Sequence, residues 1–449
     1  QDRLLTRTSQ MPLNELIPRL DDMIAGIKRD LGFAAGQDEP SRKAEAERRE
    51  RDTEEQETMR TDRAKLNAGF EKREKETKKR DRDALNPQFE QKKKQERATT
   101  DRWMSPELDF TAHGMRVGDV NGDGRQEILL LQDHAVKAFI KRKGRLEHLA
   151  THKLGSRTRA LNLNLASAKE AGTRPILISA VFDKEPRSQV LEFRNEHFAV
   201  RAKDIKLFLN TVRIPPEYDL RIVGQKLKAP GIFANGVSLV SRQSGSYALG
   251  RTLELPSAAN VFNFTYLPQK ENYKIIVADA RNSLRVYSAS GELQTRTDTA
   301  YAGSEIRIER TTSLPGMGED PNDDVPEYYY LPTRLIPCNL NADEQFELLA
   351  NHGISEIPQF LANTRSFSEG EIHSLYWSGR SLSTAWQTQT IQGSVRDYGL
   401  GDMDNDGTLE LYVCLTTSSG MLSWDSKKTL LLSFPLDMPN SSEQAIFRP

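Results

Sequence analysis

Two nine-residue segments far apart in the chain share one pattern of oxygen-bearing side chains. Positions 1, 3, 5 and 9 carry Asp, Asn or Glu, and position 6 is glycine, which permits a sharp turn. Ca²⁺ prefers six to eight oxygen ligands, and alternate side chains of a short turn can reach one ion while position 7 offers its backbone carbonyl. The sequence therefore predicts two calcium loops, whose ligands are Asp119, Asn121, Asp123, Arg125 and Glu127 in the first and Asp402, Asp404, Asp406, Thr408 and Glu410 in the second.

A third copy of this pattern is degenerate. Glu344 replaces the glycine at position 6, and an amide replaces the first acid. If this loop also binds Ca²⁺, its ligands are Asn339, Asn341, Asp343 and Glu347. A fourth segment, around Asn162 and Asn164, keeps only the spacing and is predicted to bind no metal. For every copy the alternative is a polar β-turn, in which Asp and Asn bond to their own backbone without metal.

The segments that flank these loops read as strands, so an EF-hand, which has flanking helices, is disfavoured. From Trp103 onward, short apolar runs alternate with turn residues. Repeats of this length with four strands each are typical of propeller blades. We expect an all-β fold, a β-propeller of six or seven four-stranded blades, with 102–109 closing the ring as an outer strand of the last repeat. Six repeats are readable, at 115–154, 158–200, 205–250, 258–298, 333–391 and 396–436, and 301–330 is predicted to be a long inserted loop.

The chain divides into zones of different composition. Residues 1–36 have an apolar stripe at helical spacing, which predicts an amphipathic helix. Residues 37–101 are dominated by interleaved charges and are predicted to form a helical or disordered spacer. The propeller is assigned to 102–440 and a C-terminal tail to 441–449. The first helix is either the remnant of an upstream domain or a segment that docks on a partner chain.

The bulk composition excludes several classes of function. A net charge of −1 over 449 residues gives no electrostatic attraction to nucleic acid, and no apolar run is long enough for a transmembrane helix. Cys338 and Cys414 are expected to be buried free thiols, although a single bridge between them stays open. No nucleophile–base motif is present, and His148 and His152 fall on a predicted outer strand. We therefore expect a protein that is not an enzyme.

The segments beginning at Val117 and at Leu400 resemble FG-GAP/VCBS repeats, the calcium-binding blades of integrin-α-like propellers in bacterial envelope and secreted proteins. The resemblance implies that loop positions 1, 3, 5 and 9 bind Ca²⁺. It also implies a periplasmic, outer-surface or secreted location. A weaker resemblance links 14–20 and 30–33 to the closing helix of a TolB-like domain.

These observations favour a non-catalytic, calcium-stabilised binding or scaffold module of the bacterial envelope. A protein partner is expected to bind the N-terminal helix or the propeller loops, and the oligomeric state is left open. The alternative is a structural subunit of a surface filament or multi-protein assembly. An enzyme acting at the propeller mouth is a third hypothesis.

Overall fold

The computed structural model describes residues 102–168, 173–228, 231–243, 245–309, 328–355, 365–417, 427–436 and 446–448. The helix predicted over 1–36 and the spacer predicted over 37–101 lie outside the described residues. All described residues belong to one compact unit formed by 97–449. Within that described part, no helix has the length and apolarity needed to cross a membrane.

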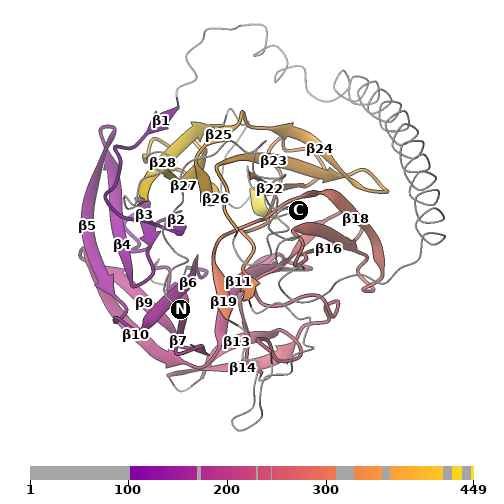
Figure 1. The fold of residues 1–449 in the computed structure, drawn as a ribbon, viewed down its shortest axis with the longest axis horizontal. Coiled ribbons are helices and arrows are strands. Elements are labelled where there is room, and N and C mark those ends of the chain that lie inside the picture. Colours follow the sequence, from indigo (N-terminus) through magenta and orange to yellow (C-terminus); the bar gives the residue numbers. More distant parts are fainter. Residues whose placement is uncertain are drawn as a thin grey trace, which may run out of the picture. The chain divides into compact units, whose positions relative to one another are not determined.

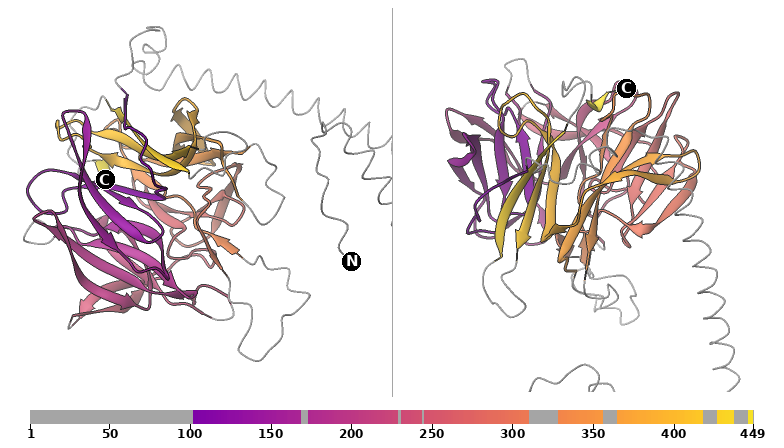
Figure 2. Two further views of the ribbon diagram at one scale, coloured as in Figure 1. Left: turned by 60° about the vertical axis from the view of Figure 1, so that its left-hand side comes forward. Right: turned by 90° about the horizontal axis from the view of Figure 1, so that it is seen from above.

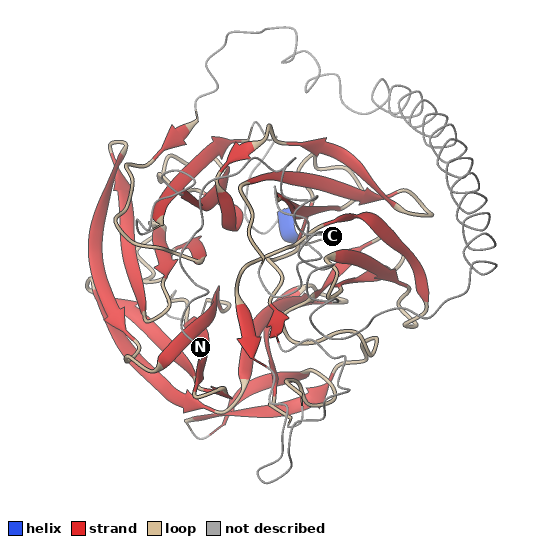
Figure 3. Ribbon diagram, viewed as in Figure 1, coloured by secondary structure: helices blue, strands red, loops and turns tan. Residues whose placement is uncertain are grey.

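Six antiparallel sheets radiate from a central axis, each with its first strand innermost (Figures 1 and 3). The first blade contains β2 (Gly114–Gly118), β3 (Glu127–Leu131), β4 (Ala135–Arg142) and β5 (Arg145–Lys153). The second contains β6 (Thr158–Leu165), β7 (Ile176–Phe182), β9 (Ser188–Arg194) and β10 (His197–Ile205), with β8 (Glu185–Pro186) paired to β7. The third contains β11 (Phe208–Ile214), β12 (Asp219–Gln225), β13 (Ser238–Gln243) and β14 (Ser246–Thr252).

The remaining three blades follow the same plan. The fourth contains β15 (Phe264–Pro268), β16 (Tyr273–Ala278), β17 (Ser283–Tyr287) and β18 (Leu293–Ala300). The fifth contains β21 (Ile336–Cys338), β22 (Glu347–Ile354), β23 (Glu369–Trp377) and β24 (Leu382–Gln387), with β25 (Ile391–Gln392) paired to β23. The sixth contains β26 (Ser394–Gly401), β27 (Glu410–Thr417) and β28 (Lys428–Pro435) together with β1 (Trp103–Met104). The predicted all-β propeller is confirmed, and it has six blades rather than seven.

Burial along the strands follows their distance from the axis. All five residues of β3 are buried, because neighbouring blades cover both faces of an inner strand. All residues of β5, at the outer edge of the same blade, are at least partly exposed. Figure 2 shows the blades from two further directions. This gradient explains why the apolar runs used to recognise the repeats coincide with inner strands.

The hydrophobic core is divided among the blade interfaces. The described residues form six clusters of buried side chains, and each cluster is centred between two adjacent blades. The cluster between the third and fourth blades includes edge-to-face contacts among Phe208, Phe233 and Phe262. The ring is therefore held together by packing between consecutive blades, as a blade cannot bury both of its faces alone.

The ring closes through a strand from the start of the described chain. Trp103 of β1 pairs with Ser433 of β28, and Leu108 forms an isolated bridge with Thr429. The fully buried Thr429 Oγ1 accepts a hydrogen bond from Ala112 N at 2.8 Å and donates one to Phe110 O at 2.6 Å. The predicted closing strand is therefore present, but it consists of β1 and the isolated bridge at Leu108 rather than a continuous strand over 102–109.

The prediction of a loop over 301–330 is wrong at its ends. β19 (Arg307–Glu309) and β20 (Tyr328–Tyr330) form an antiparallel ribbon, because Ile308 is buried in the core cluster of the third and fourth blades. Residues 310–327 lie outside the described residues. Cys338 and Cys414 are buried free thiols, so the bridge left open by the sequence is absent.

The end of the chain also contacts the propeller. Residues 446–447 form a helical turn, Ile446 is buried in the cluster between the fifth and sixth blades, and its carbonyl accepts a hydrogen bond from Asn339 N at 2.8 Å. Residues 437–440, at the end of the predicted propeller, and residues 441–445 of the predicted tail lie outside the described residues.

Candidate functional site

All three predicted calcium loops occupy the same place in a blade. Asp119 to Glu127 joins β2 to β3, Asp402 to Glu410 joins β26 to β27, and Asn339 to Glu347 joins β21 to β22. Each loop therefore connects the innermost strand to the second strand. The fourth copy differs, because Asn162 and Asn164 lie within β6 rather than in a turn.

The two full loops share one backbone conformation around their first acid. Asp119 accepts hydrogen bonds from Gly122 N at 2.6 Å and Gly124 N at 2.9 Å. Asp402 accepts hydrogen bonds from Asp406 N at 3.1 Å and Gly407 N at 3.0 Å, so the bond from the position-6 glycine is common to both loops. The glycine at position 6 has a φ of 83° in the first loop and 86° in the second, a conformation that favours glycine. The sequence reading of this position is thus confirmed.

The closing glutamates are buried behind the loops. Val120 N donates to Glu127 Oε2 at 3.0 Å, and Met403 N donates to Glu410 Oε2 at 2.5 Å. The pKa of both carboxyls is raised to about 7, chiefly by burial and also by the neighbouring aspartates of each loop, while these amide bonds act in the opposite direction. A buried carboxyl surrounded by other carboxylates favours a bound cation.

The second full loop fits a divalent cation. Oxygen atoms of Asp402, Asp404 and Glu410 all lie within 4.8 Å of one another, and among the described residues this is the one acidic or histidine group with such a spacing. Asp404 Oδ2 accepts a hydrogen bond from Lys141 Nζ at 2.9 Å, whereas its buried Oδ1 has no hydrogen-bond partner in the described part of the chain. Hard carboxylate oxygens in this arrangement are suited to Ca²⁺.

In the first full loop an amide group lies among the carboxylates. Asn121 Nδ2 donates to Glu127 Oε1 at 2.8 Å and to Asp123 Oδ2 at 3.2 Å. Asn121 Oδ1, the atom that would bind a cation, accepts a hydrogen bond from Asp123 N at 2.8 Å. The three carboxylates of this loop, its Asn121 amide and the Arg125 carbonyl are also a donor set that Ca²⁺ accepts.

The degenerate loop keeps the closing glutamate but not the conformation at its start. Leu340 N donates to Glu347 Oε2 at 3.1 Å, and burial raises the pKa of Glu347 to about 7. Asn339, however, donates its side-chain amide to Asp343 O instead of accepting backbone bonds at position 1. Glu344 forms an exposed ion pair with Lys270 at 2.6 Å. This loop does not reproduce the arrangement that the two full loops share.

The two full loops contact each other across the ring closure. Asn405 Oδ1 accepts a hydrogen bond from Gln126 N at 2.5 Å, and Asn405 Nδ2 donates to Gln126 O at 3.3 Å. Lys141, on β4 of the first blade, reaches Asp404 in the loop of the sixth blade. The loops are far apart in sequence, but they sit in the first and last blades, which become neighbours when the ring closes.

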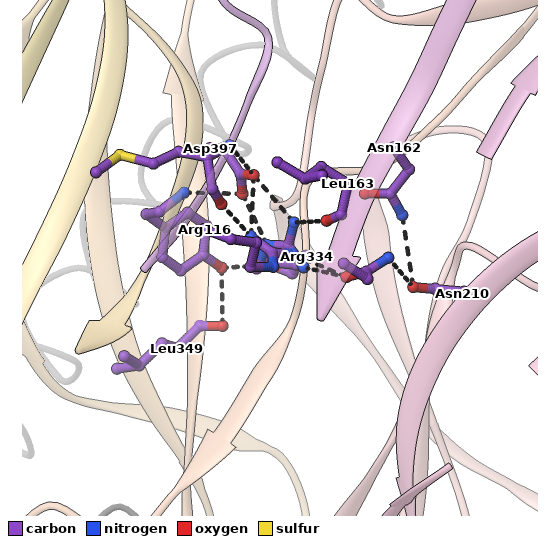
Figure 4. Close-up of polar contacts among 10 residues, drawn as sticks. Arg116, Asn162, Leu163, Asn210, Arg334, Leu349 and Asp397 are labelled. Carbon is purple, nitrogen blue, oxygen red and sulfur yellow. Dashed lines mark hydrogen bonds and ion pairs between the residues drawn. The ribbon is translucent and has the colours of Figure 1, made fainter. Parts of the chain in front are cut away.

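The structure also contains a polar network at the propeller axis, which sequence reasoning missed (Figure 4). The carboxylate of Asp397 on β26 accepts hydrogen bonds from Arg116 Nη1 at 3.1 Å, Arg334 Nε at 2.7 Å and Arg334 Nη2 at 2.9 Å. It also accepts backbone N–H bonds from Met115 at 2.8 Å and Tyr398 at 2.9 Å. In the sequence, the signal for this network is the charged pair Arg396 and Asp397 within β26, whose residues are all buried.

Asparagines extend this network to the second and third blades. Asn164 Oδ1 accepts hydrogen bonds from Arg116 Nη2 at 2.9 Å and Arg334 Nη1 at 3.1 Å. Asn164 Nδ2 donates to Asn210 Oδ1 at 2.8 Å, and Asn162 approaches the same oxygen at 3.5 Å (Figure 4). The asparagines that the loop pattern selected as a fourth copy thus have a different structural role.

A cavity of about 230 Å³ follows the axis beside this network. Its described lining comes mostly from the innermost strands and from residues before β21, and includes Arg116, Asn164, Arg334 and Asp397. His113 and Thr333 line it as well. The cavity combines apolar walls with a few convergent polar groups, as binding sites for small molecules do.

The histidines expected on the outer strand are there. His148 and His152 lie on β5, where His148 Nε2 contacts Thr151 Oγ1 at 2.9 Å and His152 Nε2 contacts Gln189 Oε1 at 3.2 Å. Sequence reasoning missed a second pair: the rings of His352 and His373 are 5.3 Å apart.

His373 lies between Glu371 Oε2 at 2.9 Å and the Tyr301 hydroxyl at 3.2 Å. Burial lowers its pKa despite the nearby Glu371 carboxylate.

Comparisons with known proteins give limited information. No family model matches the chain, and no curated protein matches it. A crystal structure of BBS1N in complex with ARL6DN, soaked with mercury, matches with a TM-score of 0.38 and 11% identity over 76% of this chain and 97% of that chain. The lead-soaked counterpart matches with a TM-score of 0.38 and 10% identity over 75% and 98%. At this level of similarity the matches carry no argument about function, and the six-blade architecture rests on the strand pairing described above.

Proposed function

We propose that this protein is a non-catalytic binding or scaffold module whose propeller ring is fixed at its closure by two calcium ions. The observation that carries the proposal is the pair of full loops, which share one conformation and are joined through Asn405 and Gln126. The ions would be held by the carboxylates of each loop, and they would neutralise the buried glutamates Glu127 and Glu410. Bound calcium would add positive charge beside these two buried carboxyls.

The position of the loops supports a structural role for the metal. Both lie between the first two strands of a blade, and closing the ring requires the first and last blades to stay together. A short β1 and the bridge at Leu108 provide backbone pairing on the outer side of the sixth blade. The hydrogen bonds between the two full loops add a second connection between the first and sixth blades.

Calorimetric titration of the calcium-free protein tests the metal proposal. We expect two Ca²⁺ per chain for the wild type, one for Asp402→Ala and none for the variant that also carries Asp119→Ala. Asp343→Ala in the degenerate loop is the matched control and is expected to leave the stoichiometry at two. A wild type that binds no calcium would refute the proposal.

The proposed partner is a protein that recognises the loops around the propeller, and the proposed location is the bacterial envelope or the medium, as the FG-GAP/VCBS resemblance implies. The structural-assembly alternative makes a different prediction in solution. X-ray scattering and sedimentation of the full chain would show a monomer for a binding module and a concentration-dependent assembly for a filament subunit.

A further inference from the structure

The central cavity has an excess of positive charge in its wall. Among the described residues that line it, Asp397 is the single carboxylate, and it is shared by Arg116 and Arg334. Arg396, which also lines the cavity, is paired with Glu305 at 2.7 Å, and Arg174 and Arg213 are the other arginines of the described lining. Within the group of Arg116, Arg334 and Asp397, one carboxylate between two guanidinium groups leaves one positive charge uncompensated.

The same group has more hydrogen-bond donors than acceptors. Two guanidinium groups carry about ten N–H donors between them. Arg116 and Arg334 make seven hydrogen bonds within the described part of the chain, to Asp397, Asn164 and the carbonyls of Met115 and Leu163. Asp397 itself already accepts five bonds. The network thus offers fewer acceptors than donors, and a further acceptor that enters the cavity can use the remaining N–H groups.

A second observation points to a ligand in the same cavity. His113 and Thr333 line this cavity and are only 8% and 6% exposed. The buried atoms His113 Nε2 and Thr333 Oγ1 have no hydrogen-bond partner among the described residues. A buried polar atom left unpaired costs about 1–3 kcal/mol. Both groups can hydrogen-bond to an oxygen atom, and burial keeps His113 uncharged at neutral pH by lowering its pKa to about 4.

We propose that the axial cavity is a binding site for a small oxyanion, a phosphate or carboxylate group, which Arg116 and Arg334 bind and which His113 and Thr333 help to orient. Guanidinium groups recognise such oxyanions through charge-assisted hydrogen bonds. The cavity volume of about 230 Å³ is below the usual range for drug-sized ligands, which restricts the ligand to a small molecule or a single acidic group. The site uses no residue of the calcium loops, so it does not depend on bound metal.

Calorimetry on the full chain tests this proposal. The calcium-free protein is titrated near neutral pH and at constant ionic strength with inorganic phosphate, and separately with succinate, with chloride as the reference anion. We expect one saturable site for at least one of the two oxyanions. Phosphate alone would identify a phosphate-type ligand, succinate alone a carboxylate-type ligand. Binding of neither would overturn the proposal.

Two arginine variants locate the site. Arg334→Met is expected to weaken oxyanion binding by about tenfold or more, since charge-assisted hydrogen bonds are worth about 1.5–3 kcal/mol. Arg142→Met is the matched control, because Arg142 is exposed on β4 and pairs only with Glu147 at 3.1 Å. Equal weakening in both variants would also overturn the proposal.

Chemical labelling of the wild-type protein covers the case in which Arg334→Met does not fold. Phenylglyoxal modifies accessible arginines, and peptide mass spectrometry measures the rate at each position. The Arg334 side chain is 20% exposed and therefore reachable. The oxyanion is expected to slow modification of Arg334 and to leave Arg142 unchanged. An unchanged rate at Arg334 under saturating phosphate and succinate would contradict the proposal.

Discussion

Asp397→Asn is the substitution whose effect follows most directly from the structure. The carboxylate is 4% exposed and accepts five hydrogen bonds, three of them from guanidinium groups. An asparagine has the same shape, but whichever way its amide is turned, its NH₂ group faces donors: Met115 N, Arg116 and Arg334 on one side, Arg334 and Tyr398 N on the other. The substitution thus leaves two buried cations without a counter-charge.

Removing one partner of a buried ion pair typically costs about 3–5 kcal/mol. With about 2 °C of melting temperature per kcal/mol for a domain of this size, we expect a loss of about 6–10 °C. Differential scanning calorimetry and urea unfolding at neutral pH measure the change. Asp183→Asn is the control, because Asp183 pairs with Arg157 at the surface, where both side chains are more than half exposed.

The control is expected to shift the free energy of unfolding by less than about 1 kcal/mol. If Asp397→Asn has an effect as small as the control, the axial network does not contain the charge pairing described here. A double-mutant cycle with Arg334→Met then measures the coupling between Asp397 and Arg334, which we expect to be large, since the two side chains share two hydrogen bonds.

Three further predictions concern the ring closure and the cavity. Thr429→Val removes a hydroxyl that bonds to Ala112 N and Phe110 O, so chemical denaturation should show a loss of about 1–3 kcal/mol, whereas an unchanged midpoint would mean that β1 is not closed as described. Asn405→Ala breaks both bonds to Gln126, and calorimetry should show weaker calcium binding at the intact first loop; equal affinities would show that the loops act independently. Burial lowers the pKa of His113 from 6.5 to about 4, so His113 takes up its proton at a higher pH in the unfolded chain than in the folded protein. The free energy of unfolding therefore falls as the pH drops from about 6.5 to 4. His113→Phe should remove about 3 kcal/mol of that decline, and parallel pH profiles for the variant and the wild type would contradict the assignment.

The sequence predicted the fold better than the site. Each repeat contains apolar inner strands separated by turn residues, so its boundaries could be read locally, and the closing strand followed from the need to complete the last blade. The ends of the 301–330 segment were missed because the pairing of β19 with β20 depends on Ile308 reaching a core formed by other blades. No local pattern encodes that contact.

The candidate sites show the same division. The turn at Gly124 and Gly407 is local, so its spacing predicted the conformation of both loops. The bridge between Asn405 and Gln126 and the group formed by Arg116, Arg334 and Asp397 were not predictable, because they join blades that are distant in sequence. Asn164 illustrates the difficulty: its spacing suggested a loop, but it lies on an inner strand and binds two arginines.

Thermal unfolding with and without calcium tests the central claim most directly. If Ca²⁺ binds both full loops in the folded state only, each site at about 100 times its dissociation constant adds about 2.7 kcal/mol of stability. Two sites then raise the melting temperature of the wild type by about 10 °C, at about 2 °C per kcal/mol. The variant that carries Asp119→Ala and Asp402→Ala should show no such shift. Superimposable curves for the wild type with saturating calcium and with chelator would contradict the account.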